Sequence, residues 1–158
     1  SEGAARQVLE DGMRWYASHR TQYARGDADR FTEARILYEL QRWNASRAIA
    51  ESLAGEHAEN ADYLGLAAAS AVRMGDAESA RRFLTSIQAL PVRYGMGTAP
   101  FAAARAFAAF GQLDSAQAAL TTSIAQGHEL DLWVHREPDF GSLRGNPAYA
   151  RVTTPRTP

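Results

Sequence analysis

Apolar residues along most of this chain recur at intervals of three and four, with polar residues between them. This spacing places the apolar side chains on one face of an α-helix. No stretch alternates apolar and polar residues long enough to indicate a β-strand. The pattern predicts an all-α protein that opens with an amphipathic helix over residues 2–19. The apolar face of that helix consists of Ala5, Val8, Leu9, Met13 and Tyr16.

Three similar segments follow, and they cover residues 27–60, 61–96 and 97–127. Each has a predicted turn, at Gln41, Gly75 and Gly111, and these positions are spaced by 34 and 36 residues. Seven positions before each turn lies a small residue: Ala34, Ala68 and Ala104. Five positions after each turn lies another: Ser46, Ala80 and Ala116. Two antiparallel helices approach closely only where side chains are small, so each segment is predicted to be a packed helix pair.

A helix–turn–helix unit that repeats about every 34 residues resembles the tetratricopeptide repeat (TPR) family. The resemblance implies a right-handed α-solenoid of about three helix pairs. Gln41 departs from the family pattern, because glycine stands at the turn in the second and third repeats. Residues 1–26 are then an N-terminal capping helix and its link, which cover the exposed end of the first repeat.

The segment after the repeats is rich in aromatic residues and prolines. It includes the string from Asp131 to Phe140, followed by Leu143-Arg144 and Asn146-Pro147. This string resembles the tail of TPR blocks in large bacterial signalling and regulatory proteins. The resemblance implies a capping segment over residues 128–152, which seals the apolar end of the array. Residues 153–158 are predicted to be a frayed tail.

Helix ends are marked by a few residues. Asn60, Asp76 and Thr98 are predicted N-caps, because their side-chain oxygens can accept hydrogen bonds from free backbone amides. Gly127 is a predicted helix stop. The glycines of residues 95–98 indicate a flexible link, although backbone amides ahead of a helix can also hold an anion.

Composition excludes several kinds of chemistry. The chain has 158 residues, of which 32 are alanine, and it contains neither cysteine nor lysine. Disulfides, thiolate nucleophiles, iron–sulfur clusters, Schiff bases and a Walker-type lysine are therefore excluded. A net charge of −1 shows no nucleic-acid footprint. The longest apolar run, 64–72, is too short for a membrane span.

The start of the sequence bears on the cellular location. No basic stretch followed by an apolar core opens the chain, so no signal peptide is predicted. The chain starts with Ser1 rather than Met, which is expected of a processed protein or an excised fragment. A cytoplasmic location is the first interpretation, with a periplasmic or other extracytoplasmic location as the alternative.

Histidines and carboxylates gather after the last repeat, and such side chains can bind zinc. They are His128, Glu129, Asp131, His135, Glu137 and Asp139. The TPR resemblance already implies that His135, Glu137 and Asp139 belong to a capping turn, so this is the preferred interpretation and no metal or cofactor is expected. Neither Gly-x-Ser-x-Gly nor Ser-x-x-Lys occurs, and no enzyme activity is predicted.

The first helix of each repeat is expected to line the concave side of the array. Helical phase predicts a binding groove lined by Phe31, Arg35, Tyr38, Arg73, Phe101 and Arg105. Arginine forks match carboxylates and aromatic rings offer rigid apolar contact, so the expected ligand is a peptide or protein segment with an acidic group. The alternative is that these arginines are an ordinary solvated surface.

The predicted function is therefore a non-enzymatic scaffold for protein–protein interaction. The alternative function is a structural subunit or docking domain of a larger complex, which uses its outer helices and caps. Self-association through Trp15, Tyr16 or Trp43 is a further hypothesis, because exposed aromatic residues often mark interfaces.

Overall fold

The computed structural model of the chain describes residues 2–19, 26–91, 96–130 and 132–154. All regular elements in these ranges are helices, and the absence of strands there confirms the predicted all-α class. The elements are α1 (Glu2–Ser18), α2 (Asp27–Glu39), α3 (Trp43–Glu56), α4 (Ala61–Arg73), α5 (Ala77–Gln88), α6 (Thr98–Ala109), α7 (Leu113–Ala125), α8 (Leu132–Arg136), the 3₁₀ helix η1 (Pro138–Ser142) and α9 (Pro147–Thr153).

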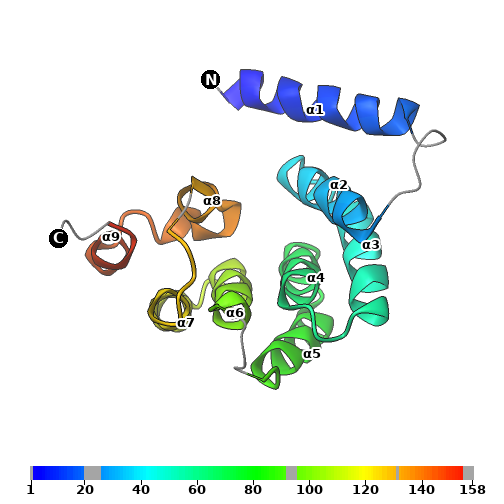
Figure 1. The fold of residues 1–158 in the computed structure, drawn as a ribbon. Coiled ribbons are helices and arrows are strands. Elements are labelled where there is room, and N and C mark those ends of the chain that lie inside the picture. Colours follow the sequence, from blue (N-terminus) through cyan, green and yellow to red (C-terminus); the bar gives the residue numbers. More distant parts are fainter. Residues whose placement is uncertain (1, 20–25, 92–95, 131, 155–158) are drawn as a thin grey trace.

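Helices α2 to α7 form three successive packed pairs, α2 with α3, α4 with α5, and α6 with α7. Helix α4 also packs against α3 of the first pair and α6 of the third pair, so the central pair contacts both of its neighbours through its first helix. Figure 1 shows α2, α4 and α6 on the inner side of an arc, with α3, α5 and α7 outside. Helix α1 lies across the open side of that arc (Figure 1).

The small residues predicted at the helix crossings are buried. Ala34, Ala68 and Ala104 are 0% exposed. The residues predicted opposite them, Ser46, Ala80 and Ala116, are also 0% exposed. Ser46 is polar, and its hydroxyl donates a hydrogen bond of 2.8 Å to the carbonyl oxygen of Ala34. That bond satisfies the hydroxyl, whose burial without a partner would be costly.

One turn geometry closes all three pairs. The turn residues have positive φ angles: 61° at Gln41, 78° at Gly75 and 76° at Gly111. In each turn the following amide donates to the carbonyl oxygen five residues earlier, at 2.8–2.9 Å. This is the hydrogen bond of a Schellman helix end. Gln41 therefore adopts the left-handed backbone conformation that glycine adopts without steric cost.

The helix caps agree with the sequence at three of the four predicted positions. Asn60 accepts from the amide of Asp62 at 3.0 Å, and Asp76 accepts from that of Ser79 at 3.0 Å. Gly127 follows the end of α7 with φ 94°. The prediction for Thr98 was wrong, because α6 begins at Thr98 itself and the N-cap is Gly97.

Gly97 also differs from the flexible link that its sequence indicated. Its φ angle is 74°, and a Cβ atom at this position would lie 2.1 Å from the carbonyl oxygen of Ser123. The Ser123 hydroxyl donates to the carbonyl oxygen of Gly97 at 2.7 Å. Glycine is therefore required by close packing against the end of α7, whereas Gly95 of the predicted link lies outside the described residues.

The C-terminal segment seals the last helix pair. Its side chains Val134, Phe140 and Leu143 are 0% exposed and join the core of α6 and α7. Helix α9 extends through Thr153, which is buried, so order continues past the predicted boundary at residue 152. The predicted tail residues 155–158 and the side chain of Trp133 lie outside the described residues.

Candidate interaction surface

The predicted groove residues lie on the three inner helices. Phe31, Arg35 and Tyr38 belong to α2, Arg73 belongs to α4, and Phe101 and Arg105 belong to α6. The structure brings the side chains of Tyr38, Arg73 and Arg105 together. They converge on a carboxylate of the same chain, that of Asp139 in η1, instead of on open solvent.

Asp139 connects the C-terminal segment to all three inner helices. Its side chain is 0% exposed. Oδ1 accepts from the Tyr38 hydroxyl at 2.5 Å and from Arg73 Nη2 at 2.9 Å. Oδ2 lies 3.3 Å from Arg105 Nη2. Burial, and after it the charge of Asp139, raise the pKa of Tyr38 well above its usual value, so the phenol stays protonated and can donate.

Glu137 is a second buried carboxylate in the same network. Its Oε1 lies 3.1 Å from Arg105 Nε, and both side chains are less than a tenth exposed. Burial raises the pKa of Glu137, while the positive charge of Arg105 opposes that shift. The backbone carbonyl of Glu137 accepts from Arg144 Nη2 at 2.7 Å. The acidic residues on both sides of Pro138 thus meet the arginines predicted to bind a carboxylate in another molecule.

This contact fills the inner surface. The gap between α2, α6 and η1, bordered by Tyr38, Arg105 and Pro138, leaves no space for a water molecule. Phe101 is a core residue here: it stacks on His128 at 4.2 Å between ring centroids and meets Phe140 edge-on at 5.5 Å. The sequence predicted only a capping turn at Glu137 and Asp139. The sequence contained one signal for this pairing: two acidic residues in the cap, and three predicted groove arginines to which no acidic partner had been assigned.

Two predicted groove residues, Phe31 and Arg35, border a real cavity. A cleft of about 570 Å³ lies between α1, α2 and residues 136–138. Its lining is mainly apolar, with charged residues among it: Ala5, Val8, Leu9, Phe31, Thr32, Arg35, Ile36, Glu39, Arg136, Glu137 and Pro138. The N-terminal helix therefore forms one wall of the cleft, a role that its sequence pattern did not reveal.

The apolar face of α1 is only half covered. Gly12 approaches Ile36 of α2, with 4.0 Å between an added Cβ and Cδ1. Arg42 holds the helix through Glu10 at 2.9 Å. Val8 nevertheless remains 70% exposed and Trp15 55% exposed. Trp43, another aromatic residue considered for self-association, packs against the core of the first two pairs.

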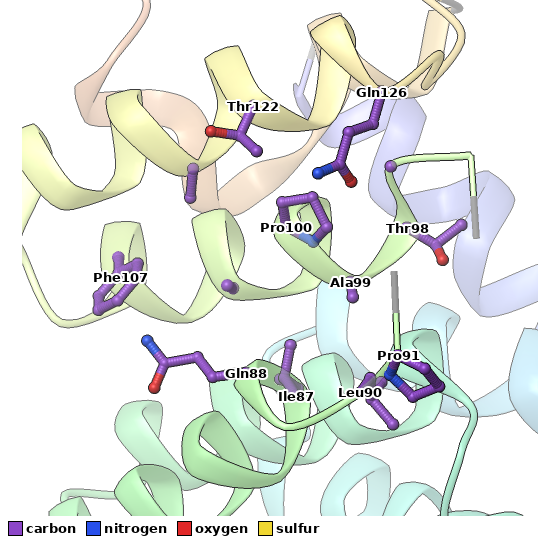
Figure 2. Close-up of a pocket in the computed structure, with 13 residues that line it drawn as sticks. Ile87, Gln88, Leu90, Pro91, Thr98, Ala99, Pro100, Phe107, Thr122 and Gln126 are labelled. Carbon is purple, nitrogen blue, oxygen red and sulfur yellow. The ribbon is translucent and has the colours of Figure 1, made fainter. Parts of the chain in front are cut away.

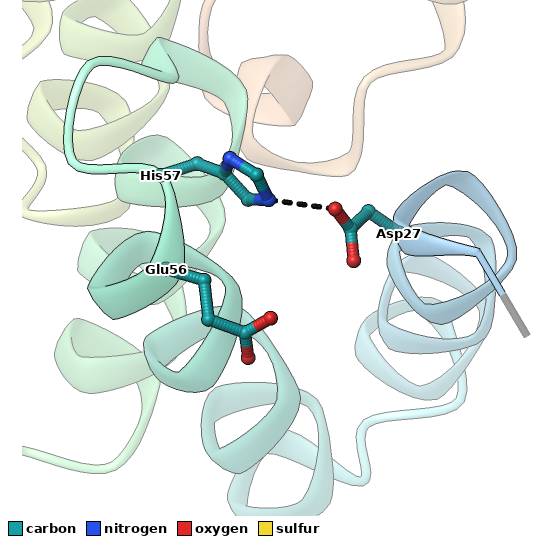
Figure 3. Close-up of side chains that lie close together, drawn as sticks. All are labelled: Asp27, Glu56 and His57. Atoms are coloured by element: carbon teal, nitrogen blue, oxygen red, sulfur yellow. Dashed lines mark hydrogen bonds and ion pairs between the residues drawn. The ribbon is translucent and has the colours of Figure 1, made fainter.

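Figure 3 shows the one group of possible metal ligands found among the described residues: Asp27, Glu56 and His57. His57 Nε2 and Asp27 Oδ2 lie 2.6 Å apart. Arg30 donates to both oxygens of Glu56 at 2.8 Å. This bidentate pair lowers the pKa of Glu56 to about 2. The guanidinium already supplies the positive charge that a cation would bring, so the group is best explained as an ion-pair network joining α2 to α3.

A second cavity lies on the outer side of the array. Figure 2 shows it between the end of α5, helix α6 and the side of α7 that carries Thr122. Its volume is about 250 Å³, and all of its lining residues are uncharged. Ile87, Leu90 and Phe107 contribute apolar surface, whereas Gln88 and Gln126 bring amide groups.

Among the described helices, none combines the length and apolar character needed to cross a membrane. No family model, no curated protein and no solved structure matches this chain.

Proposed function

We propose that the chain is a TPR-like α-solenoid that serves as a non-enzymatic scaffold for protein–protein interaction. The repeated turn, with its positive φ and common hydrogen bond, supports the repeat assignment. The buried small residue at each helix crossing supports it further. Repeat arrays of this kind present extended surfaces to partners.

The observation that carries the proposal is the cleft between α1, α2 and residues 136–138. Its volume of about 570 Å³ accommodates several side chains of a partner. Arg73 and Arg105 form ion pairs with Asp139, so they stabilise the scaffold. The proposed docking site is therefore the end of the predicted groove where Phe31 and Arg35 lie, and not its centre.

The test is selection of a random peptide library displayed on phage against the immobilised chain. A Val8→Asp variant places a charge in the cleft wall and should abolish binding of the selected peptides. Ala17→Asp is the matched control. Ala17 lies nine positions after Val8, which corresponds to two and a half helical turns, so the same charge is placed on the opposite side of α1. Peptides that bind both variants as they bind the parent chain would refute the cleft as the docking surface.

A second candidate function is a docking domain that uses its outer helices. The uncharged cavity between α5, α6 and α7 favours it, since apolar cavities accept partner side chains. Thr122 is exposed at that cavity, and Thr122→Arg should block it without disturbing the core. Peptides lost with Thr122→Arg but retained with Val8→Asp would assign docking to the outer face.

A further inference from the structure

We infer that the cleft binds the exposed edge of α1 from a second copy of this chain, so that two copies associate about a two-fold axis. The inference rests on the proposed docking function of the cleft and names its occupant. A two-fold contact uses the same patch on both copies, so the patch must be complementary to itself.

The apolar part of the patch contains both a projection and a recess. Val8 lines the cleft yet is 70% exposed, so its side chain projects from the wall. Trp15 lies seven positions later, which is close to two helical turns, and extends the exposed apolar edge on the same side of α1. The adjoining recess is lined by Leu9, Phe31 and Ile36. Two copies related by a two-fold axis can each place a Val8 edge in the recess of the other.

The charges of the patch are also complementary to those of a second copy. Glu137 in the lining is paired with Arg105. In the part of the chain that the structure describes, the side chains of Arg136 and Glu39, which also line the cleft, have no hydrogen bond or ion pair. A uniformly acidic or basic partner would leave one of these two charges unmatched. A second copy brings one charge of each sign, so that Arg136 of each copy can face Glu39 of the other.

Long-range repulsion between two copies is small. The chain carries a net charge of −1 from 17 basic and 18 acidic residues. Proteins with net charge close to zero associate more readily than strongly charged ones. The contact is thus opposed mainly by the entropy of association, which apolar burial at Val8 and Trp15 offsets.

Sedimentation equilibrium over a concentration series tests the inference with charge reversal. The parent chain should show a reversible monomer–dimer equilibrium. Arg136→Glu alone, or Glu39→Arg alone, should raise the dimer dissociation constant about tenfold, because each places like charges opposite one another. The double variant should restore the parent value. The matched control pair is Arg81→Glu and Glu59→Arg, which lie away from the cleft and should leave the equilibrium unchanged. Both side chains are exposed, and among the described residues neither has a partner.

Two outcomes would overturn the inference. If the chain stays monomeric at every concentration, no second copy occupies the cleft, and peptides selected there would leave the proposed docking function standing. If a dimer forms but charge reversal does not weaken it, the copies meet through another surface. Loss of peptide binding and of dimerisation together, with the Val8→Asp variant still folded, supports both the docking function and its occupant.

Discussion

Tyr38 and Asp139 are separated by 101 positions in the chain and share a buried hydrogen bond of 2.5 Å. The bond joins the first inner helix to the C-terminal segment. Arg73 and Arg105 reach the same carboxylate from the second and third pairs. One side chain of the cap therefore connects all three helix pairs, and the orientation of the pairs relative to one another depends on it.

Removal of the Asp139 carboxylate should destabilise the whole domain. We expect Asp139→Ala to lower the free energy of unfolding by roughly 3–5 kcal/mol, because it leaves buried Arg105 incompletely paired. Tyr38→Phe removes one hydroxyl and keeps both arginines paired, so its cost should be about 1.5–3 kcal/mol. Urea denaturation followed by circular dichroism measures both. Equal, near-zero costs would show that the network contributes no net stability.

The turn of the first pair contains backbone strain that a substitution can relieve. Gln41 has φ 61°, where a residue with a Cβ atom is strained. Gln41→Gly should raise the free energy of unfolding by about 1 kcal/mol. This is the net effect of relieving the backbone strain in the folded state and of adding conformational entropy to the unfolded chain. Thermal and urea denaturation provide the measurement.

The second and third turns supply the matched controls. Gly75→Ala and Gly111→Ala should each lower stability by about 1 kcal/mol, because their φ angles are 78° and 76°. An added Cβ meets no atom within 4 Å at either position, so these variants report backbone conformation alone. A stability gain in either variant would contradict the assignment of one turn geometry to all three pairs.

The N-cap of α5 should make stability sensitive to acid. Hydrogen bonds from Ser79, and then Arg47, lower the pKa of Asp76 from 3.8 to about 2. A carboxyl group whose pKa is lower in the folded state stabilises that state above its unfolded pKa. This contribution should disappear as the pH falls from about 4 to about 2.

Asp76→Asn separates this effect from the other carboxylates. Asparagine retains the cap but cannot titrate, so the difference in stability between parent and variant should shrink through that pH range. Urea midpoints measured at several pH values give the difference directly. A difference that is constant with pH would show that the Asp76 charge does not contribute to folding.

The local features of the fold followed from the sequence because their causes are local. Helix periodicity, the N-caps Asn60 and Asp76, and the small residues at the crossings depend on neighbours within a turn or on a repeated spacing. The same holds for the positions of the turns at Gly75 and Gly111. These residues determined an all-helical chain of three similar pairs with capping segments at both ends.

The tertiary structure decided how the polar groups are used. Helical phase placed Arg73 and Arg105 on the inner side, but phase carries no information about a carboxylate at position 139. The requirement for Gly97 likewise arises from the carbonyl of Ser123, which packing brings near. The cleft exists because α1 covers only part of α2. Contacts between distant segments depend on how whole helices pack, and pairing and burial in three dimensions determine which charges remain available to a partner.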